Sequence, residues 1–443
     1  MTGLPRRSDV VIVGGGAAGL AAARQLTEAG ADVVLVEAAG RLGGRIVTDT
    51  VDGFRLDRGF QVVNTAYPAL PDFLDIGQLD LRLFDHAVLL ADDNGRHRLA
   101  DPRRHHELPA QVSGLRQLPV PLTGLARLAG LSLRLGYQDP KALLAEPETS
   151  AAAYLSARIG EQATRGLAEP FLTGVFGDRP LLTSSRVMAM IWRAFVRGRI
   201  GVPADGMQRL ISLLAGPIPA DRLYLNTPVS AIDGQRVHTP DATIEARAVL
   251  VATDPGAAAR LVPGLPAPPQ RILVTTYHAA DQPPVRRPVL LLDGTGRSGI
   301  ANSIVVTLAA PGYAPAGRHL IATTAPAEAG LDEAAIRGHL AVLYGQPTGD
   351  WEHIATVRAE PGLVTAPPRQ GRLRKPVRLS STLFVAGDHR DTPSLQGALV
   401  SGRRAARAVL RELGLLVPAA SGQLGGDGER LPEAGQEPDA SGQ

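Results

Sequence analysis

The sequence contains no cysteine, which excludes disulfide bonds, thiolate nucleophiles and cysteine-ligated metal sites. Lysine is almost absent, since only Lys141 and Lys375 occur, and aromatic residues make up 4% of the chain. No apolar run reaches the roughly 18 residues that a membrane-spanning helix needs. Residues 1–8 form a short, polar segment, and we expect no export signal there. We therefore expect a cytoplasmic protein.

Charge and size narrow the class further. The formal net charge is only +3, and no long basic block with interleaved aromatics occurs, so we expect no nucleic acid partner. No group of residues has the spacing of metal ligands, so we expect no metal site. With 443 residues, 44% of them hydrophobic, the chain can form two closely joined domains.

The glycine-rich segment near the start of the chain is the strongest motif. Residues 10–13 form an apolar run typical of a buried parallel strand. Gly14, Gly16 and Gly19 follow with the GxGxxG spacing, and a helix is expected over residues 17–28. The free N–H groups and the positive dipole end of such a helix favour phosphate, and the glycines allow a pyrophosphate to approach. The segment therefore predicts a dinucleotide site.

An acidic residue follows the second expected strand. Residues 33–36 are again apolar, and Glu37 stands at the end of this strand. A carboxylate there can accept hydrogen bonds from both ribose hydroxyls, whereas it would repel a 2′-phosphate. NADP is therefore disfavoured.

A second glycine turn comes shortly after this acid. Gly43 and Gly44 allow the chain to fold back beside the pyrophosphate. Arg41 and Arg45 flank them and can offer forked donors to phosphate or flavin oxygens.

The far end of the chain carries a matching segment. Residues 381–388 are expected to form a strand that ends in Gly387 and Asp388, and a helix containing Gly397 and Ala398 follows. With the Gly-Gly-Arg turn, this segment resembles the superfamily of flavin amine oxidases, phytoene desaturases and protoporphyrinogen oxidases. The resemblance implies non-covalently bound FAD, with the N-terminus of the last helix facing the flavin.

The resemblance also implies which residues contact FAD. They are Gly14, Gly16, Ala17, Ala18, Gly19, Glu37, Ala38, Arg41, Gly43, Gly44, Arg45, Gly59, Phe60, Gln61, Val229, Thr253, Gly387, Asp388, Leu395, Gln396 and Ala398. A second GxGxxG pattern, at residues 294–299, lies between two strand-like segments rather than before a helix. It is expected to be a hairpin loop and not a second dinucleotide site.

The expected fold class is α/β, with a Rossmann-like FAD-binding domain and an inserted substrate domain of mixed β-sheet plus helices. Residues 1–80, 215–260 and 375–415 are assigned to the FAD domain. The substrate domain takes residues 81–214, expected to be mostly helical, and residues 265–370, which are rich in strand patterns. The tail, residues 418–443, is rich in Gly, Ser, Glu and Pro and is expected to be disordered.

The reaction follows from the resemblance and from two departures. Amine oxidases of this superfamily carry a lysine near the flavin, which assists reoxidation by oxygen; the matching strand, at about residues 274–277, has none. They also carry an aromatic residue just before the final helix, where this chain has Ser394. We therefore expect an FAD-dependent dehydrogenase or desaturase that transfers a hydride equivalent from an organic, lipophilic substrate. The alternatives are an amine oxidase with an atypical site and a non-redox binding protein on the same fold.

Candidates for further roles are few. His389 could shuttle a proton, with Asp391 beside it, but the favoured interpretation is that these polar groups cap the final helix or brace the cofactor. Asn302 and Gln396 are polar residues that could touch substrate. Residues 108–135 are apolar but broken by arginines and prolines, so they fit either an ordinary lid or a peripheral membrane surface. The electron acceptor, O2 or a quinone, and the oligomeric state stay open.

Overall fold

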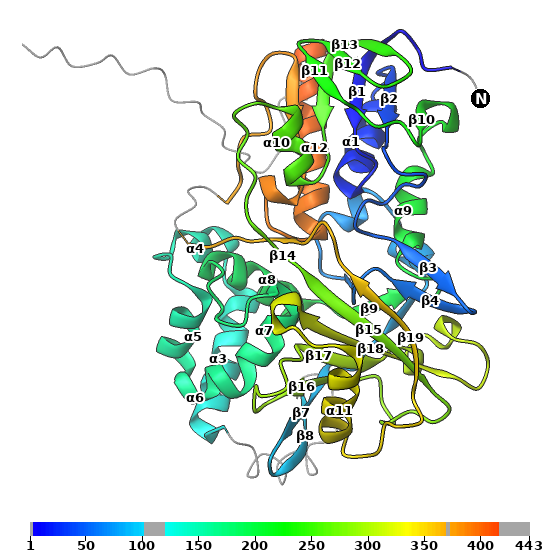
Figure 1. Ribbon diagram of the computed structural model, residues 1–443. Helices are drawn as coiled ribbons and strands as arrows, with labels where there is room; N and C mark the ends of the chain where they lie inside the picture. The colour runs from blue at the N-terminus through cyan, green and yellow to red at the C-terminus, as the bar shows by residue number, and fades with distance from the viewer. Residues whose placement is uncertain (1–2, 102–119, 369–372, 416–443) are drawn as a thin grey trace, which may run out of the picture.

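The computed structural model describes residues 3–101, 120–368 and 373–415. Two sheets, one above the other in Figure 1, organise the described chain. The expected tail at residues 418–443 and the first part of the 108–135 segment lie outside the described residues.

The first sheet has a parallel centre built from distant parts of the chain. Its order is β10-β2-β1-β13-β12-β11, and β21 also pairs with β13. The contacts of β1 with β2 and β13, and of β13 with β21, are parallel. The strands are β1 (Arg7–Val13), β2 (Val33–Val36), β10 (Leu223–Tyr224), β11 (Ala231–Asp233), β12 (Arg236–His238), β13 (Thr243–Val251) and β21 (Leu383–Val385). This is the expected Rossmann-like arrangement.

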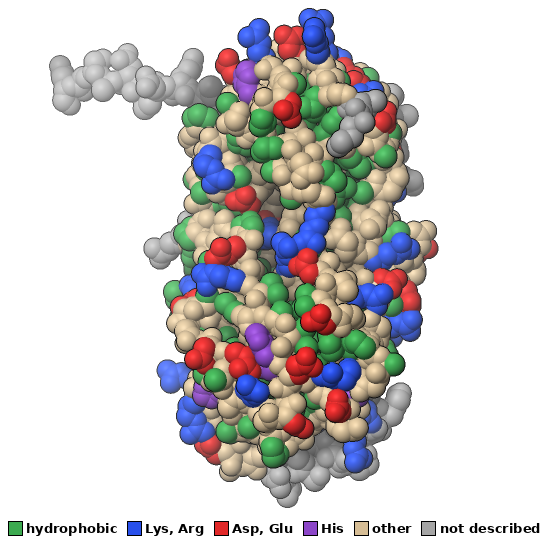
Figure 2. All heavy atoms as spheres, turned by 45° about the vertical axis from the view of Figure 1, so that its right-hand side comes forward, with side chains coloured by type: hydrophobic (Ala, Val, Ile, Leu, Met, Phe, Trp, Pro, Cys, Tyr) green, Lys and Arg blue, Asp and Glu red, His purple; other side chains and the backbone are tan. Residues whose placement is uncertain are grey.

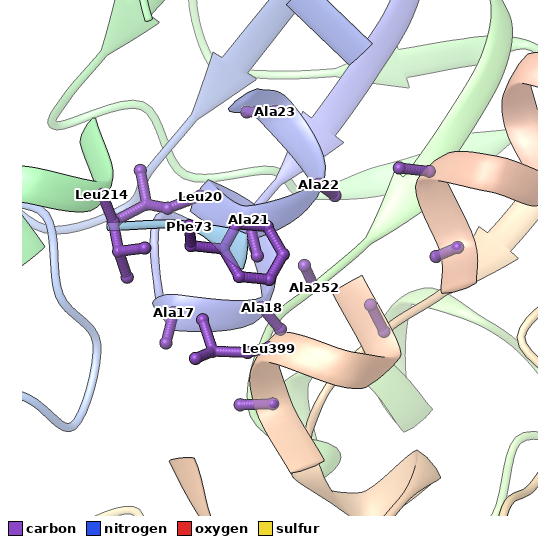
Figure 3. Packing of buried hydrophobic residues seen from close by; sticks show 14 of the residues in the cluster. Ala17, Ala18, Leu20, Ala21, Ala22, Ala23, Phe73, Leu214, Ala252 and Leu399 are labelled. Carbon is purple, nitrogen blue, oxygen red and sulfur yellow. The ribbon is translucent and has the colours of Figure 1, made fainter. Parts of the chain in front are cut away.

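Two helices pack tightly together on this sheet. They are α1 (Ala17–Glu28), with the bounds expected from the sequence, and α12 (Leu395–Leu413). Figure 3 shows Leu399 of α12 against Ala17 and Ala18 of α1. A Cβ at Gly402 would overlap the carbonyl oxygen of Ala18, so only glycine permits this approach. Helix α9 (Gln208–Ala215) joins the same apolar cluster, and α10 (Pro255–Leu261) follows β13.

The second sheet is mixed, with the order β19-β15-β18-β17-β16-β7-β8. Only β16 and β7 pair in parallel, and the other neighbours are antiparallel. Helix α11 (Glu333–Tyr344) packs on this sheet through an apolar cluster that includes Ile336 and Leu340. The strands are β7 (Ala87–Asp92), β8 (Gly95–Ala100), β15 (Leu273–Ala280), β16 (Leu290–Asp293), β17 (Asn302–Val305), β18 (His319–Pro326) and β19 (Glu352–Arg358).

Short strands connect the two sheets. They are β3 (Thr48–Val51) with β4 (Phe54–Asp57), β14 (Gln270–Arg271) with β20 (Leu363–Val364), and β5 (Val63–Asn64) and β6 (Leu81–Leu83), which both pair with β9 (Ile200–Pro203).

The segment 81–214 is helical over only part of its length, and the expectation needs two corrections. Residues 87–100 form the hairpin β7–β8, in which Asp92 pairs with Gly95 across a two-residue turn of Asp93 and Asn94. At the other end, α9 packs beside α1, so the chain returns to the first sheet before residue 215. The helices between are α3 (Leu122–Tyr137), α4 (Pro140–Ala145), α5 (Ala151–Ile159), α6 (Glu161–Ala163), α7 (Glu169–Phe176) and α8 (Ser185–Arg197).

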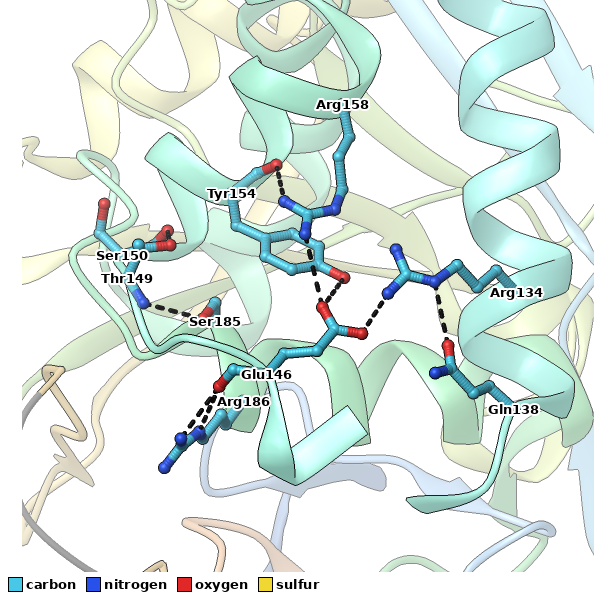
Figure 4. Close-up of polar contacts among 9 residues, drawn as sticks. All are labelled: Arg134, Gln138, Glu146, Thr149, Ser150, Tyr154, Arg158, Ser185 and Arg186. Atoms are coloured by element: carbon cyan, nitrogen blue, oxygen red, sulfur yellow. Dashed lines mark hydrogen bonds and ion pairs between the residues drawn. The ribbon is translucent and has the colours of Figure 1, made fainter. Parts of the chain in front are cut away.

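A polar cluster around Glu146 links several of these helices through hydrogen bonds and ion pairs (Figure 4). The Glu146 carboxylate pairs with Arg134 of α3 and accepts hydrogen bonds from the Tyr154 hydroxyl (3.3 Å) and Arg158 (3.4 Å) of α5. Its backbone carbonyl accepts hydrogen bonds from Arg186 of α8. One glutamate therefore positions three helices relative to one another.

The buried side chain of Asp57, at the end of β4, links this strand and the start of α9 to the second sheet. It is only 4% exposed. Its carboxyl accepts hydrogen bonds from the Tyr313 hydroxyl (2.9 Å) and the Met207 amide (3.0 Å), and its carbonyl oxygen accepts one from the Tyr277 hydroxyl of β15 (2.6 Å). Burial raises the pKa of Asp57 from 3.8 to about 6.

This pKa predicts how stability depends on pH. The pKa of Asp57 is higher in the folded state than in the unfolded chain, so the protonated carboxyl stabilises the fold. This contribution to the free energy of unfolding is fully present below pH 3.8 and is lost as the pH rises through about 6, by about 3 kcal/mol in total. Asp57→Asn removes the ionisation, so its unfolding free energy should fall less than that of the wild type between pH 4 and 7. Urea unfolding at four pH values measures this difference, with Asp52→Asn at an exposed turn as the control. Equal pH slopes in wild type and Asp57→Asn would show that the carboxyl ionises normally.

Candidate active site

A large cavity of about 1740 Å³ lies between the two sheets. Small-molecule sites usually measure about 300–1,000 Å³, so this one has room for a dinucleotide and a second molecule. The first residues of α1 and of α12 both line it. Two helix N-termini therefore present their N–H groups and positive dipole ends to one space.

Most residues implicated by the sequence line this cavity. They are Gly14, Gly16, Ala17, Ala18, Glu37, Ala38, Gly43, Gly44, Arg45, Phe60, Gln61, Val229, Thr253, Gly387, Asp388, Leu395 and Ala398. Four of the expected residues do not line it: Gly19, Arg41, Gly59 and Gln396. We call the space bounded by the first group the dinucleotide half.

Each of the three glycines of the first motif is required for a different structural reason. Gly14 has φ +110°, and a Cβ there would lie 2.8 Å from the carbonyl oxygen of Ala252. At Gly19 a Cβ would overlap the carbonyl of Gly14, so this glycine serves helix packing rather than ligand contact. A Cβ at Gly16 would meet no atom within 4 Å, because it would project into the cavity. The space that Gly16 leaves free fits a pyrophosphate.

Glu37 is held in place by backbone donors. Its Oε2 accepts a hydrogen bond from the Gly15 amide (2.7 Å), and its Oε1 accepts one from the Ala39 amide (2.8 Å). Each oxygen keeps a further lone pair for a ligand hydroxyl. The carboxylate is therefore oriented at the cavity edge, where a ribose would need it.

Arg45 and Asp388 join the two ends of the chain across the cavity. Their ion pair has an Nη2–Oδ1 distance of 2.7 Å, and Arg45 also donates to the carbonyl of Gly362 (3.3 Å). The Asp388 carboxylate raises the pKa of Arg45. A guanidinium and a carboxylate side by side offer a donor and an acceptor to a phosphate and a ribityl hydroxyl.

Arg41 and Gln396 are used elsewhere. Arg41 pairs with Asp49 (2.7 Å), which also binds Arg58. The Gln396 Oε1 accepts a hydrogen bond from the Ala69 amide (3.0 Å). The expectation that both touch the cofactor is thus not supported by their positions, because each is engaged with a neighbouring protein group.

The two catalytic candidates, His389 and Asp391, line a separate small cavity of about 40 Å³, which Lys375 also borders. His389 is 4% exposed, and burial lowers its pKa to about 4. Burial raises the pKa of Asp391, which pairs with Arg374 (3.4 Å) and Arg404 (3.6 Å). Neither residue lines the large cavity, so a bracing role suits them better than proton transfer to a substrate.

The other part of the cavity is strongly apolar, and sequence reasoning missed most of it. It lies between α3, α7 and α8 on one side and β7, β16 and β17 on the other. Phe171 packs edge-on against Trp192 (5.9 Å between ring centroids) and Phe195 (5.1 Å). We call it the apolar half; its lining is Phe84, Val88, Leu99, Leu125, Leu128, Leu167, Phe171, Val175, Ile191, Trp192, Phe195, Val196, Leu273, Leu290 and Ile304. The signal that could have predicted it is the grouping of Phe171, Trp192 and Phe195 in the helical segment, since aromatic residues are scarce in this chain.

The strand at residues 274–277, where a lysine near the flavin was expected in an amine oxidase, needs a correction. These residues belong to β15 but do not line the cavity, which β15 reaches only through Leu273; the neighbouring β19 lines it through Thr356, Val357 and Arg358. Among the described residues, no lysine lines the cavity. Ser394 does line it, and its hydroxyl caps α12 by accepting a hydrogen bond from the Gly397 amide (3.2 Å).

The second glycine pattern is the expected hairpin loop. It joins β16 to β17, which pair antiparallel. The Asp293 carboxylate organises the loop, because it accepts hydrogen bonds from the backbone amides of Thr295 (2.8 Å) and Ser298 (2.8 Å).

The outer face of α3 is unusually apolar. Leu122 is 55% exposed, Leu133 49% and Tyr137 64%. Leu133 also lines the cavity, so α3 connects the apolar half with the surface. In the described part of the chain, no helix has the length and apolar character needed to cross a bilayer. On the face shown in Figure 2, basic and acidic side chains are interspersed.

Comparison with known proteins identifies the family to which this chain is related. The family model for flavin-containing amine oxidoreductases matches residues 17–410. A putrescine oxidase of Kocuria rosea is 29% identical over 286 residues, which are 57% of this chain and 58% of that protein. A carotenoid 3,4-desaturase of Haloarcula japonica is 57% identical over 51 residues, 12% of this chain and 10% of that protein. These alignments thus span under two thirds of the relatives' length.

The fold is shared with solved structures. The cyclohexylamine oxidase from Brevibacterium oxydans IH-35A superposes with a TM-score of 0.66 at 20% sequence identity. The match covers 92% of this chain and 99% of that chain. The glycines, Glu37 and the Arg45–Asp388 pair that line the dinucleotide half fit the FAD that a flavin-containing family requires.

Gly16→Val tests this site. The valine side chain would project into the free space beside Gly16, whose extended backbone (φ −77°, ψ 178°) accepts valine. We expect a folded protein that retains less than about one tenth of the wild-type flavin, measured as the absorbance ratio of flavin to protein. The control is Gly338→Val on the exposed face of α11, where a Cβ also meets nothing. Normal flavin content in Gly16→Val would contradict the cofactor assignment.

Proposed function

Since the chain belongs to the flavin-containing amine oxidoreductase family, we propose that it is an FAD-dependent dehydrogenase or desaturase of a lipophilic organic substrate. Bound FAD supplies hydride acceptance at a C–H bond of that substrate. The protein residues supply the rest: the dinucleotide half holds the cofactor, and the apolar half orients the substrate and excludes water.

The lining of the apolar half is the observation that carries this proposal. Leucines and aromatic rings dominate it, and burial of such surface favours apolar molecules by about 25 cal/mol per Å². Of the acidic residues that line the cavity near the apolar half, Asp85 is already paired with Arg98 (3.3 Å) and Arg287 (3.8 Å), so Asp85 is a poor partner for a cationic amine. The short, highly identical match to a carotenoid desaturase points the same way.

Amine oxidation is the second candidate, because a putrescine oxidase aligns with this chain over 286 residues, far more than the carotenoid desaturase does. The absence of a lysine along the described cavity lining argues against it and, by the same reasoning, against fast reoxidation by O2. A quinone acceptor therefore forms part of the proposal.

Peripheral membrane contact through α3 also forms part of it. Leu122, Leu133 and Tyr137 present apolar surface where α3 borders the cavity. A lipophilic substrate or a quinone would reach the apolar half from a lipid surface by this route.

An anaerobic titration tests the reaction class. Holoenzyme is mixed with lycopene in detergent micelles, with coproporphyrinogen III or with putrescine, and flavin absorbance near ~450 nm is followed, since reduction bleaches it. We expect bleaching with the polyene and slow recovery in air. Bleaching by putrescine with rapid recovery would replace the proposal with amine oxidation.

A charge in the apolar half provides a second test. Leu128→Asp puts a carboxylate among the apolar side chains of the cavity lining, so polyene-dependent bleaching should slow at least tenfold while flavin content is kept. Ala126→Asp on the exposed side of the same helix is the matched control. Equal slowing in both variants would show a helix defect rather than a substrate contact.

A further inference from the structure

A buried amide side chain lies among the residues of the apolar half, whose lining also includes the polar side chains of His86, Arg98 and Ser132. Asn302, the first residue of β17, is 4% exposed and lines the cavity beside apolar residues such as Leu290 and Ile304. Ile304 lies two residues along the same strand and faces the same cavity, so the two side chains share one face of the sheet.

The side-chain amide of Asn302 lacks a hydrogen-bond partner in the described part of the chain. Among the described residues, none forms a hydrogen bond with its side chain, and Oδ1 is buried without a partner. Buried amides are almost always hydrogen-bonded, because an unpartnered group keeps the full cost of leaving water. A half-turn of the amide exchanges its oxygen and nitrogen, so either end can face the cavity.

The opposite helix leaves room for this amide. Gly174 lies within α7 and lines the cavity, and a Cβ there would overlap the Asn302 Nδ2. Glycine inside a helix is less favourable than alanine. Both residues are thus unfavourable for stability and meet at one point of the cavity wall, as expected of residues that serve a ligand.

We propose that Asn302, in the space left by Gly174, binds a hydroxyl group on an otherwise apolar substrate; this rests on the proposed function. A hydroxyl both donates and accepts, and so satisfies either end of the amide. The apolar neighbours of Asn302 provide no ion partner, which disfavours an ammonium or a carboxylate at this point.

Two probes that differ by one hydroxyl test this subsite. Holoenzyme is titrated with 1-pyrenemethanol or with 1-methylpyrene, and binding is read from quenching of protein fluorescence, to which Trp192 in the cavity wall contributes. We expect the wild type to bind the alcohol about tenfold more tightly than the hydrocarbon. In Asn302→Leu and Gly174→Ala this preference should vanish, whereas Ile304→Val should keep it.

Thermal unfolding of the same holoenzymes separates a ligand role from a structural one. If Asn302 serves only a ligand, Asn302→Leu should unfold at the same temperature as the wild type or about 1–2 °C higher. A lower unfolding temperature, or equal affinities for the two probes in the wild type, would overturn the subsite. Failure of both probes to bind would instead count against the lipophilic substrate, and so against the proposed function and the subsite together.

Discussion

The close contact of α1 with α12 is the constraint on which the site depends. Alanines on α1 and Gly402 on α12 let the two helices approach until backbone touches backbone. Because both helices begin at the same side of the sheet, this contact brings two N-termini to one cavity. Larger side chains at the interface would separate the helices and with them the two sources of phosphate-binding N–H groups.

The second constraint is the set of hydrogen bonds around Asp57, which links β4 and the start of α9 to the second sheet. Asp57 at the end of β4 receives hydrogen bonds from Tyr313 and the Met207 amide, while its carbonyl holds Tyr277 of β15. The Glu146 cluster acts similarly for α3, α5 and α8, which wall the apolar half. Buried or half-buried polar groups thus fix how the cavity walls are placed, and apolar side chains fill the surfaces between them.

The dinucleotide half could be predicted from the sequence because its residues follow local backbone rules. Gly14 must take a positive φ, and Glu37 must end a strand, whatever the rest of the chain does. The apolar half could not, because Phe84, Phe171 and Trp192 come together only through tertiary packing. The same limit explains Arg41: its charge was visible in the sequence, but its partner Asp49 was not. For Asn302, the sequence indicated a polar residue that could touch substrate, but not its buried position in the cavity wall.

The Arg45–Asp388 pair has a consequence for how the protein matures. It joins residues separated by most of the chain, and β21 and α12, which complete the site, come after the whole second sheet in sequence. During synthesis the glycine-rich segment emerges first but stays without its closing wall until α12 has left the ribosome. The complete flavin site therefore forms only after the whole second sheet has been synthesised.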